Sequence, residues 1–125
     1  MEELITGNSC ISLSIPKYFE KMINEKNVNF YTIEIVDHYL YKKWKIDKRY
    51  SEFRDFHNVI AKLFPKCPKL PKSTTLFQYF QFDTAESCRK NLEVYLRECN
   101  NRTDISNSEE LKRFLEVRLL IQKYR

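Results

Sequence analysis

Lys48-Arg49-Tyr50-Ser51-Glu52-Phe53 is the stretch that decides how this chain is organised, because the hydrophobic period changes there. Before it, Trp44 and Ile46 alternate with charged residues, as in a half-buried strand. After it, apolar residues recur at helical spacing: Phe53, Phe56, Ile60 and Leu63. The stretch therefore predicts a strand-to-helix junction that carries an arginine and a tyrosine, with Ser51 as the helix N-cap.

The residues before this junction predict an antiparallel meander of three strands. Cys10–Ile15 alternates apolar and polar residues, and Pro16 is expected to end this first strand. Val28–Leu40 is rich in β-branched and aromatic residues, which favour a strand. Tyr41–Tyr50 would form the third strand, with a basic stripe on one face that leads up to the junction.

The residues after the junction predict helices that are interrupted by a proline-rich loop. Pro65 ends the first helix, and the three prolines of residues 65–72 favour an extended path. A second helix starts near Asp83 or Thr84, and its apolar stripe is Cys88, Leu92, Tyr95, Leu96 and Cys99. Ser106-Asn107-Ser108-Glu109 matches a capping box for a last helix, whose inward residues are Leu111, Phe114 and Leu115. Strands followed by helices predict an α+β fold.

The composition excludes some classes of binding site and favours others. The 125 residues are enough for one domain with one core. The single glycine, Gly7, excludes glycine-rich phosphate loops and the dinucleotide fingerprint. The net charge of +5 favours an anionic partner, which could be nucleic acid, an acidic membrane leaflet or an acidic protein. The alternative is a soluble surface that is merely basic.

The sequence shows no grouping of residues that is typical of a metal site or a catalytic site. The four cysteines, Cys10, Cys67, Cys88 and Cys99, lack the close spacing of a zinc site, so free thiols in a reducing, cytosolic environment are expected. The N-terminus has no secretory signal, and no apolar run reaches the length of a membrane span. His57 is expected to be a helix residue without a nucleophile beside it. We therefore expect no enzyme activity, no cofactor and no metal.

The run Arg49-Tyr50-Ser51-x-Phe53 at such a junction resembles the phox-homology (PX) domain, a phosphoinositide-binding module of the sorting-nexin type. The proline-rich segment and the Leu-Glu-x-Tyr-Leu pattern of residues 92–96 follow in the order that the family has. The resemblance spans about residues 8–117. It implies a single PX-like domain over residues 1–125, with a meander packed against a small helical subdomain and a helical extension at residues 118–125.

The resemblance also implies a headgroup site. Arg49 would bind the 3-phosphate of phosphatidylinositol 3-phosphate, because a guanidinium can hold two phosphate oxygens at once. Tyr50 would lie under the inositol ring, and Lys72, or Lys69 as a second candidate, would hold the 1-phosphate. An ordinary structural role is the alternative for each: an ion pair, a core tyrosine and solvated loop lysines.

One family position does not match. Many PX domains carry an arginine four residues before the leucine that corresponds to Leu92, and this arginine contacts the 4- and 5-hydroxyls of the inositol. Here that residue is Cys88, and Arg89 lies about a quarter turn further round the helix. Either Arg89 reaches the site through a rotated helix, or the headgroup is held without this contact. The choice of phosphoinositide therefore stays open.

By the same resemblance, Leu76 and Phe77 would insert into the bilayer. The implied role is peripheral binding to endosomal or other phosphoinositide-bearing membranes in protein trafficking or sorting. A protein-interaction module with weak or no lipid binding is the first alternative, with Pro68–Pro71 as the docking element. A nucleic-acid binder is less favoured, because the aromatic ribonucleoprotein signature is absent.

Overall fold

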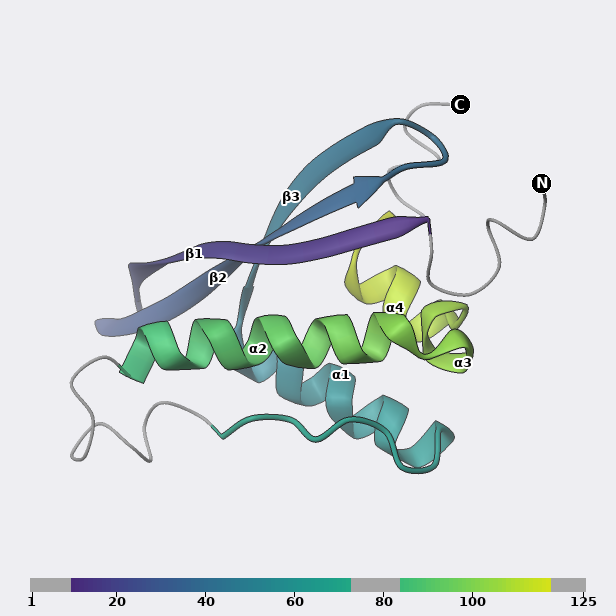
Figure 1. Cartoon of the computed structure of the whole chain (residues 1–125). Coiled ribbons are helices and arrows are strands. Elements are labelled where there is room, and N and C mark those ends of the chain that lie inside the picture. The colour runs from purple at the N-terminus through teal and green to yellow at the C-terminus, as the bar shows by residue number, and fades with distance from the viewer. Residues whose placement is uncertain (1–9, 73–83, 118–125) are drawn as a thin grey trace.

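The computed structural model describes residues 10–72 and 84–117. Its sheet is an antiparallel meander of order β1-β2-β3, in which β1 spans Ile11–Ile23, β2 Lys26–Asp37 and β3 Lys42–Arg49. Figure 1 shows α1 (Tyr50–Leu63) and α2 (Thr84–Asn101) on one side of this sheet, with α3 (Thr103–Ser106) and α4 (Glu109–Phe114) after them. The predicted α+β fold with a three-stranded meander is confirmed.

One core fills the space between the sheet and the helices. The inner face of β2 contributes Tyr31, Ile33 and Ile35, which alternate along the strand. All members of the predicted α2 stripe are buried against them: Cys88, Leu92, Tyr95, Leu96 and Cys99. The inward residues predicted for the last helix, Leu111, Phe114 and Leu115, are buried as well. The 3.6-residue and 2-residue periods thus located this core correctly.

The first strand is longer than the sequence predicted. Pro16 does not end it: the register shifts between Ser14 and Lys17, and pairing with β2 continues to Ile23. Proline cannot donate a ladder hydrogen bond, but β1 is an edge strand, where an irregularity accommodates it. The expected polar connection is therefore a turn at Asn24 and Glu25, which both have positive φ.

Polar side chains of α2 bind the backbone of β1. The Arg97 Nε–H donates to the Leu13 carbonyl at 2.9 Å, and the Asn100 amide donates to the Ile11 carbonyl at 2.9 Å. The Ile15 N–H donates to a Glu93 carboxylate oxygen at 2.7 Å. These contacts satisfy groups of an edge strand that no neighbouring strand pairs, so the position of α2 is fixed against β1.

Three details of the helices differ from the predictions. Arg49, not Ser51, is the N-cap of α1, and Tyr50 is its first residue. Leu63, predicted to belong to the apolar stripe of α1, is 54% exposed. Ser108 caps α4 by accepting from the Leu111 N–H, and the short helix α3 was not predicted. The predicted extension at residues 118–125 lies outside the described residues.

Candidate functional site

Arg49 lies at the end of β3, where the sheet passes into α1. It pairs with Phe30 of β2, which pairs in turn with Phe19 of β1, so these residues form one row across the sheet. The Arg49 backbone N–H donates to the Glu52 carboxylate at 3.0 Å. This contact satisfies a donor at the helix start and fixes the backbone that carries the guanidinium.

The nearby carboxylates are occupied by other groups. Asp47 accepts a hydrogen bond from the Thr32 hydroxyl at 2.8 Å. Glu52 accepts from the Arg49 backbone and lies 3.8 Å from the Lys48 amine. Across residues 10–72 and 84–117, the half-exposed Arg49 guanidinium forms no ion pair. Its charge is therefore not neutralised by a described carboxylate, as a site for an anion requires.

Tyr50 connects this junction to the proline-rich segment. Its ring is half-buried and packs against the core, so the structural alternative for this residue is partly correct. Its hydroxyl donates to the Pro71 carbonyl at 2.7 Å. Burial raises the pKa of Tyr50, with a smaller contribution from Cys88, so the hydroxyl stays protonated and able to donate.

The segment after α1 is held at both ends. Arg102 donates to the carbonyls of Pro65 and Lys66, at 2.9 and 2.7 Å, and Tyr50 holds Pro71. Residues 67–72 have no regular secondary structure, as the prolines predicted. Lys69 and Lys72 are exposed on this segment. Because Lys72 follows Pro71, the structure brings Arg49, Tyr50 and Lys72 into one region.

Arg89 has a different environment from Arg49. Its Nε–H donates to Glu86 at 2.8 Å, an Nη–H donates to the same carboxylate, and the other Nη–H donates to the Ile15 carbonyl. The side chain is only 14% exposed. The hydrogen bond with Glu86 raises the pKa of Arg89 and lowers the pKa of Glu86. The guanidinium thus ties α2 to β1.

Cys88, the residue at the family's arginine position, is 4% exposed and belongs to the core. Burial raises the pKa of its thiol, so it is neutral at physiological pH. Neither Cys88 nor Arg89 therefore presents a free positive charge in this arrangement.

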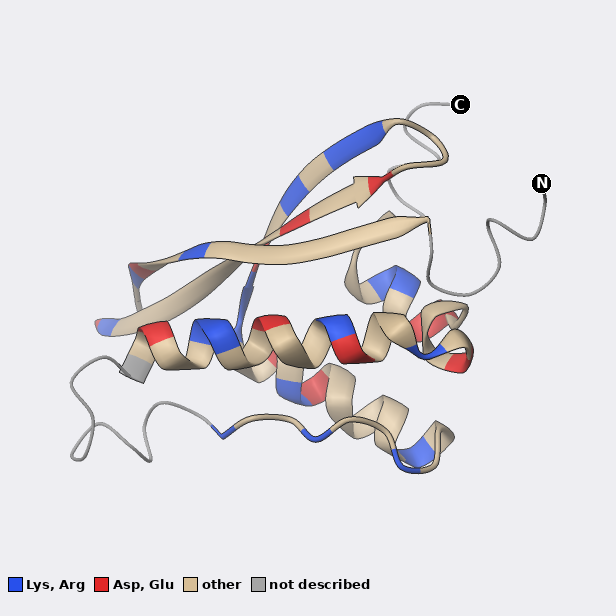
Figure 2. Ribbon diagram, in the orientation of Figure 1, with Lys and Arg blue, Asp and Glu red and all other residues tan. Residues whose placement is uncertain are grey.

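The hairpin between β1 and β2 projects beyond the row of Phe19, Phe30 and Arg49, because residues 20–29 follow that row in the register. Its exposed residues include Met22, which is 63% exposed, beside Lys21 and Lys26. Figure 2 shows further basic positions along β3 and along the segment after α1. The predicted insertion residues Leu76 and Phe77 lie outside the described residues.

Two contacts were not anticipated. Glu52 is the third residue of α1, a position from which glutamate reaches back to the N-cap, so this pattern could have identified it. Arg102 binds carbonyls 36 and 37 residues away, and no local pattern predicts such a contact. Both residues position the backbone on either side of the candidate site.

In the part of the chain that the structure describes, no group of three His, Cys, Asp or Glu side chains could hold a metal ion. None of the described helices combines the length and the apolar character needed to cross a bilayer.

The family profile that describes the PX domain matches residues 38–118. The chain belongs to the PX domain family. PX domains are generally phosphoinositide-binding modules that target proteins peripherally to membranes, and they are typically non-catalytic. No sequence among curated proteins matches the chain.

Two solved PX domains have a similar fold. A designed CISK-PX domain aligns with a TM-score of 0.72 and 21% identity, over 82% of this chain and 96% of that one. The mouse SNX19 PX domain, solved with a bound sulphate ion, aligns with a TM-score of 0.65 and 22% identity, over 85% of this chain and 96% of that one. At these identities the likeness concerns the fold alone.

Proposed function

We propose that this PX domain binds the headgroup of phosphatidylinositol 3-phosphate on the cytosolic face of endosomal or other phosphoinositide-bearing membranes. The observation that carries the proposal is the Arg49 guanidinium, which has no ion-pair partner in the described ranges and lies next to Tyr50 at the start of α1. The domain would perform no catalysis and need no cofactor or metal. It would bring an attached protein to the membrane for trafficking or sorting.

Each proposed contact follows from the chemistry of its side chain. Arg49 would hold the 3-phosphate through two parallel N–H donors, and such a charge-assisted contact contributes about 1.5–3 kcal/mol. Tyr50 would support the inositol ring, since its hydroxyl is already occupied by Pro71 and its ring remains half-exposed. Lys72, with Lys69 as a second candidate, would hold the 1-phosphate, because an ammonium on a flexible stem adapts to a mobile anion.

The contacts of Arg89 favour a structural role over the predicted role as a headgroup ligand. Reaching the lipid would require the loss of its hydrogen bonds to Glu86 and to Ile15. We therefore propose that the headgroup is held without a guanidinium from α2. The expected consequence is that this domain discriminates among phosphoinositides less strongly than PX domains that carry the α2 arginine.

Membrane association would need more than the headgroup. The exposed Met22 of the β1–β2 hairpin lies beyond the Arg49 row, and the predicted insertion residues Leu76 and Phe77 would add apolar area. Burying one such side chain contributes about 1.5–3 kcal/mol, and each lysine near an anionic leaflet adds about 1 kcal/mol. Several modest contributions would thus give reversible binding.

A liposome-sedimentation panel across the phosphoinositides tests this proposal. The native domain is expected to sediment with vesicles that contain phosphatidylinositol 3-phosphate, and Arg49→Ala to lose binding by about tenfold or more. Arg113→Ala is the matched control, because Arg113 is an exposed arginine in the last turn of α4, an element that carries none of the candidate headgroup residues. Equal binding by the native domain and Arg49→Ala, or no binding to any lipid, would refute the proposal.

The two alternative functions have less structural support. Pro68 and Pro71 are half-buried, and Leu70 between them packs against the core, so the Pro68–Pro71 element does not present a fully exposed face to an SH3-like groove. On β3, Lys43 and Lys45 lie 3.5 and 3.9 Å from Glu34, which reduces the charge available for nucleic-acid phosphates.

A further inference from the structure

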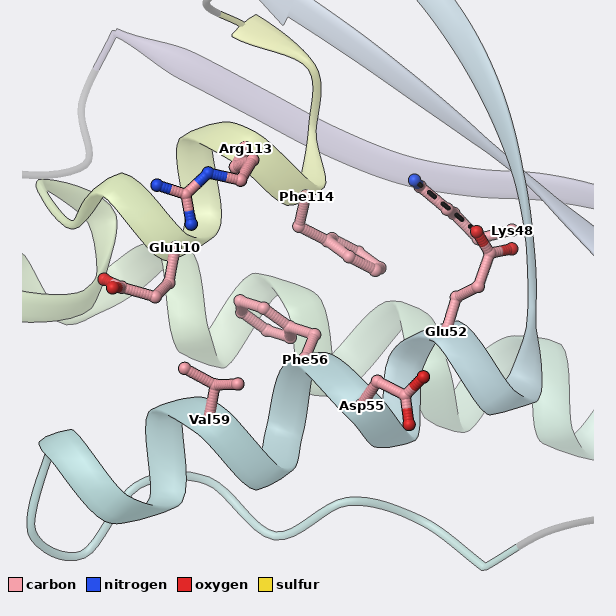
Figure 3. A pocket seen from close by; sticks show the side chains of 8 residues that line it. All are labelled: Lys48, Glu52, Asp55, Phe56, Val59, Glu110, Arg113 and Phe114. Atoms are coloured by element: carbon pink, nitrogen blue, oxygen red, sulfur yellow. Dashed lines mark ion pairs between the residues drawn. The ribbon is translucent and has the colours of Figure 1, made fainter.

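An open groove lies between α1 and α4, beside the end of β3. Its volume is about 310 Å³. Figure 3 shows that its apolar floor is made by Phe56 and Val59 of α1 and by Phe114 of α4. The charged side chains around this floor are Lys48, Glu52, Asp55, Glu110 and Arg113.

The floor of the groove combines two mostly buried rings with one exposed valine. The rings of Phe56 and Phe114 are stacked, with centroids 4.7 Å apart and an interplanar angle of 23°. Val59 is 46% exposed beside them. Stacked rings with an exposed branched side chain next to them offer a preformed apolar surface, and burying more of it would be favourable.

The charge around the groove is opposite to that of the whole chain. The chain carries a net charge of +5, whereas the groove has three carboxylates and two cations. Lys48 and Glu52 neutralise each other, since the Lys48 amine lies 3.8 Å from Glu52 and 3.5 Å from Glu116, so the other lining charges are Asp55, Glu110 and Arg113. An anionic membrane or a nucleic acid would find little attraction here. A positively charged segment would find carboxylates beside an apolar floor.

We propose that the α1–α4 groove binds a short segment of a partner protein that presents bulky apolar side chains together with lysine or arginine. An amphipathic helix fits this description, because it places apolar side chains on one face and basic ones at its borders. The apolar side chains would cover Val59 and the edges of the stacked rings. The basic ones would pair with Glu110, and with Asp55 in competition with Arg54, which lies 3.8 Å from it. This goes beyond lipid binding.

The groove and the lipid site can be occupied together. Lys48 points to the core side of β3, where its amine lies 5.1 Å from the centroid of the Phe114 ring. Arg49 is the next residue of the strand, and successive side chains of a strand point to opposite faces. Glu52 borders both places, because it caps the Arg49 backbone and lines the groove. The domain could thus hold a membrane and a protein segment at once.

The direct test uses a fluorescent helical peptide of leucine and lysine, about 14 residues or four turns long, with leucine on one face. Fluorescence anisotropy is measured with the native domain, Val59→Arg and Val94→Arg. Val94 is the matched control, because it is an exposed valine on α2, 55% exposed, that does not line the groove. Binding is expected to weaken by about tenfold for Val59→Arg and to stay unchanged for Val94→Arg.

A second peptide and a charge-reversal variant test the charge preference of the groove. A leucine–glutamate peptide of the same length is expected to bind at least about tenfold more weakly than the leucine–lysine peptide, and Glu110→Lys is expected to reduce that preference. Proton–nitrogen spectra of each variant confirm that it is folded. Equal binding by Val59→Arg and the native domain would overturn the proposal, as would equal affinity for both peptides. Self-association that Val59→Arg abolishes would identify a second copy as the occupant and would also overturn it.

Discussion

Arg49 caps the start of α1 and Arg89 lies in the second turn of α2, and the two arginines occupy opposite environments. Arg49 is half-exposed; its backbone N–H donates to Glu52, and within residues 10–72 and 84–117 its guanidinium forms no ion pair. Arg89 is mostly buried, and all three of its nitrogens donate to Glu86 or to the Ile15 carbonyl. The hydrogen bonds of Arg89 leave it fewer donors for an external anion, whereas the Arg49 guanidinium has no ion-pair partner among the described residues.

At the α2 position where many PX domains carry an arginine, this chain has residues with structural contacts. Cys88 fills core space at that position, and the adjacent Arg89 braces the edge strand β1. Helix α2 therefore contributes packing and alignment, whereas the β3–α1 junction is the region with available charge. Four predictions test this assignment of roles.

The largest effect is expected from Arg49→Lys. Lysine keeps the charge but cannot place two parallel donors on one phosphate, so binding to vesicles with phosphatidylinositol 3-phosphate should fall by about tenfold. Arg89→Lys in the same sedimentation assay should bind lipid as the native domain does. If Arg49→Lys bound fully and Arg89→Lys did not, the two roles would have to be exchanged.

Arg89→Ala should act on stability rather than on binding. The change leaves the Ile15 carbonyl without its donor, which should lower the free energy of unfolding by about 1 kcal/mol. Urea unfolding measures this change, and Lys90→Ala is the control because the exposed Lys90 amine lies 4.0 Å from the same Glu86. An unaltered unfolding midpoint for Arg89→Ala would remove the structural role that we assign to it.

Tyr50→Phe tests whether the junction and the proline-rich segment act together. The ring stays, but the hydroxyl that donates to the Pro71 carbonyl is lost, at a cost of about 1 kcal/mol. Because Lys72 follows Pro71, lipid binding should weaken by about threefold in the sedimentation assay. Lipid binding at the native level would show that the position of this segment does not matter.

The smallest effect concerns pH. Burial lowers the pKa of His57, whose ring nitrogen lies 2.9 Å from the Tyr95 hydroxyl. As the pH falls below about 6.5, the unfolded chain takes up this proton before the folded protein does, so stability decreases. His57→Gln should make the unfolding midpoint depend less on pH between about pH 7 and pH 5.5. Identical pH profiles for native protein and His57→Gln would contradict the assignment.

Much of the fold could be predicted because its core follows simple periods. The alternation of Trp44 and Ile46 and the stripe of α2 are local patterns that survive in the folded chain. The first strand could not be bounded in this way, since Pro16 is tolerated only because β1 lies at a sheet edge. Edge position depends on the assembled sheet, which no local pattern reveals.

The parts of the candidate site that lie in short local motifs could be predicted, and those that depend on distant residues could not. Arg49 and Tyr50 belong to a short motif, and the prolines correctly indicated an irregular segment beside them. The role of Arg89 depends on Ile15, which is 74 residues away in sequence. The hydrogen bonds that hold the proline-rich segment also join distant residues, so these parts required the three-dimensional arrangement.

The most direct test is an NMR titration of the native domain with short-chain, water-soluble phosphatidylinositol 3-phosphate, observing the arginine side-chain Nε–H signals. The account predicts that the Arg49 signal shifts with saturation while the Arg89 signal stays in place. A shift confined to Arg89, or no shift of either arginine at saturating lipid, would contradict it.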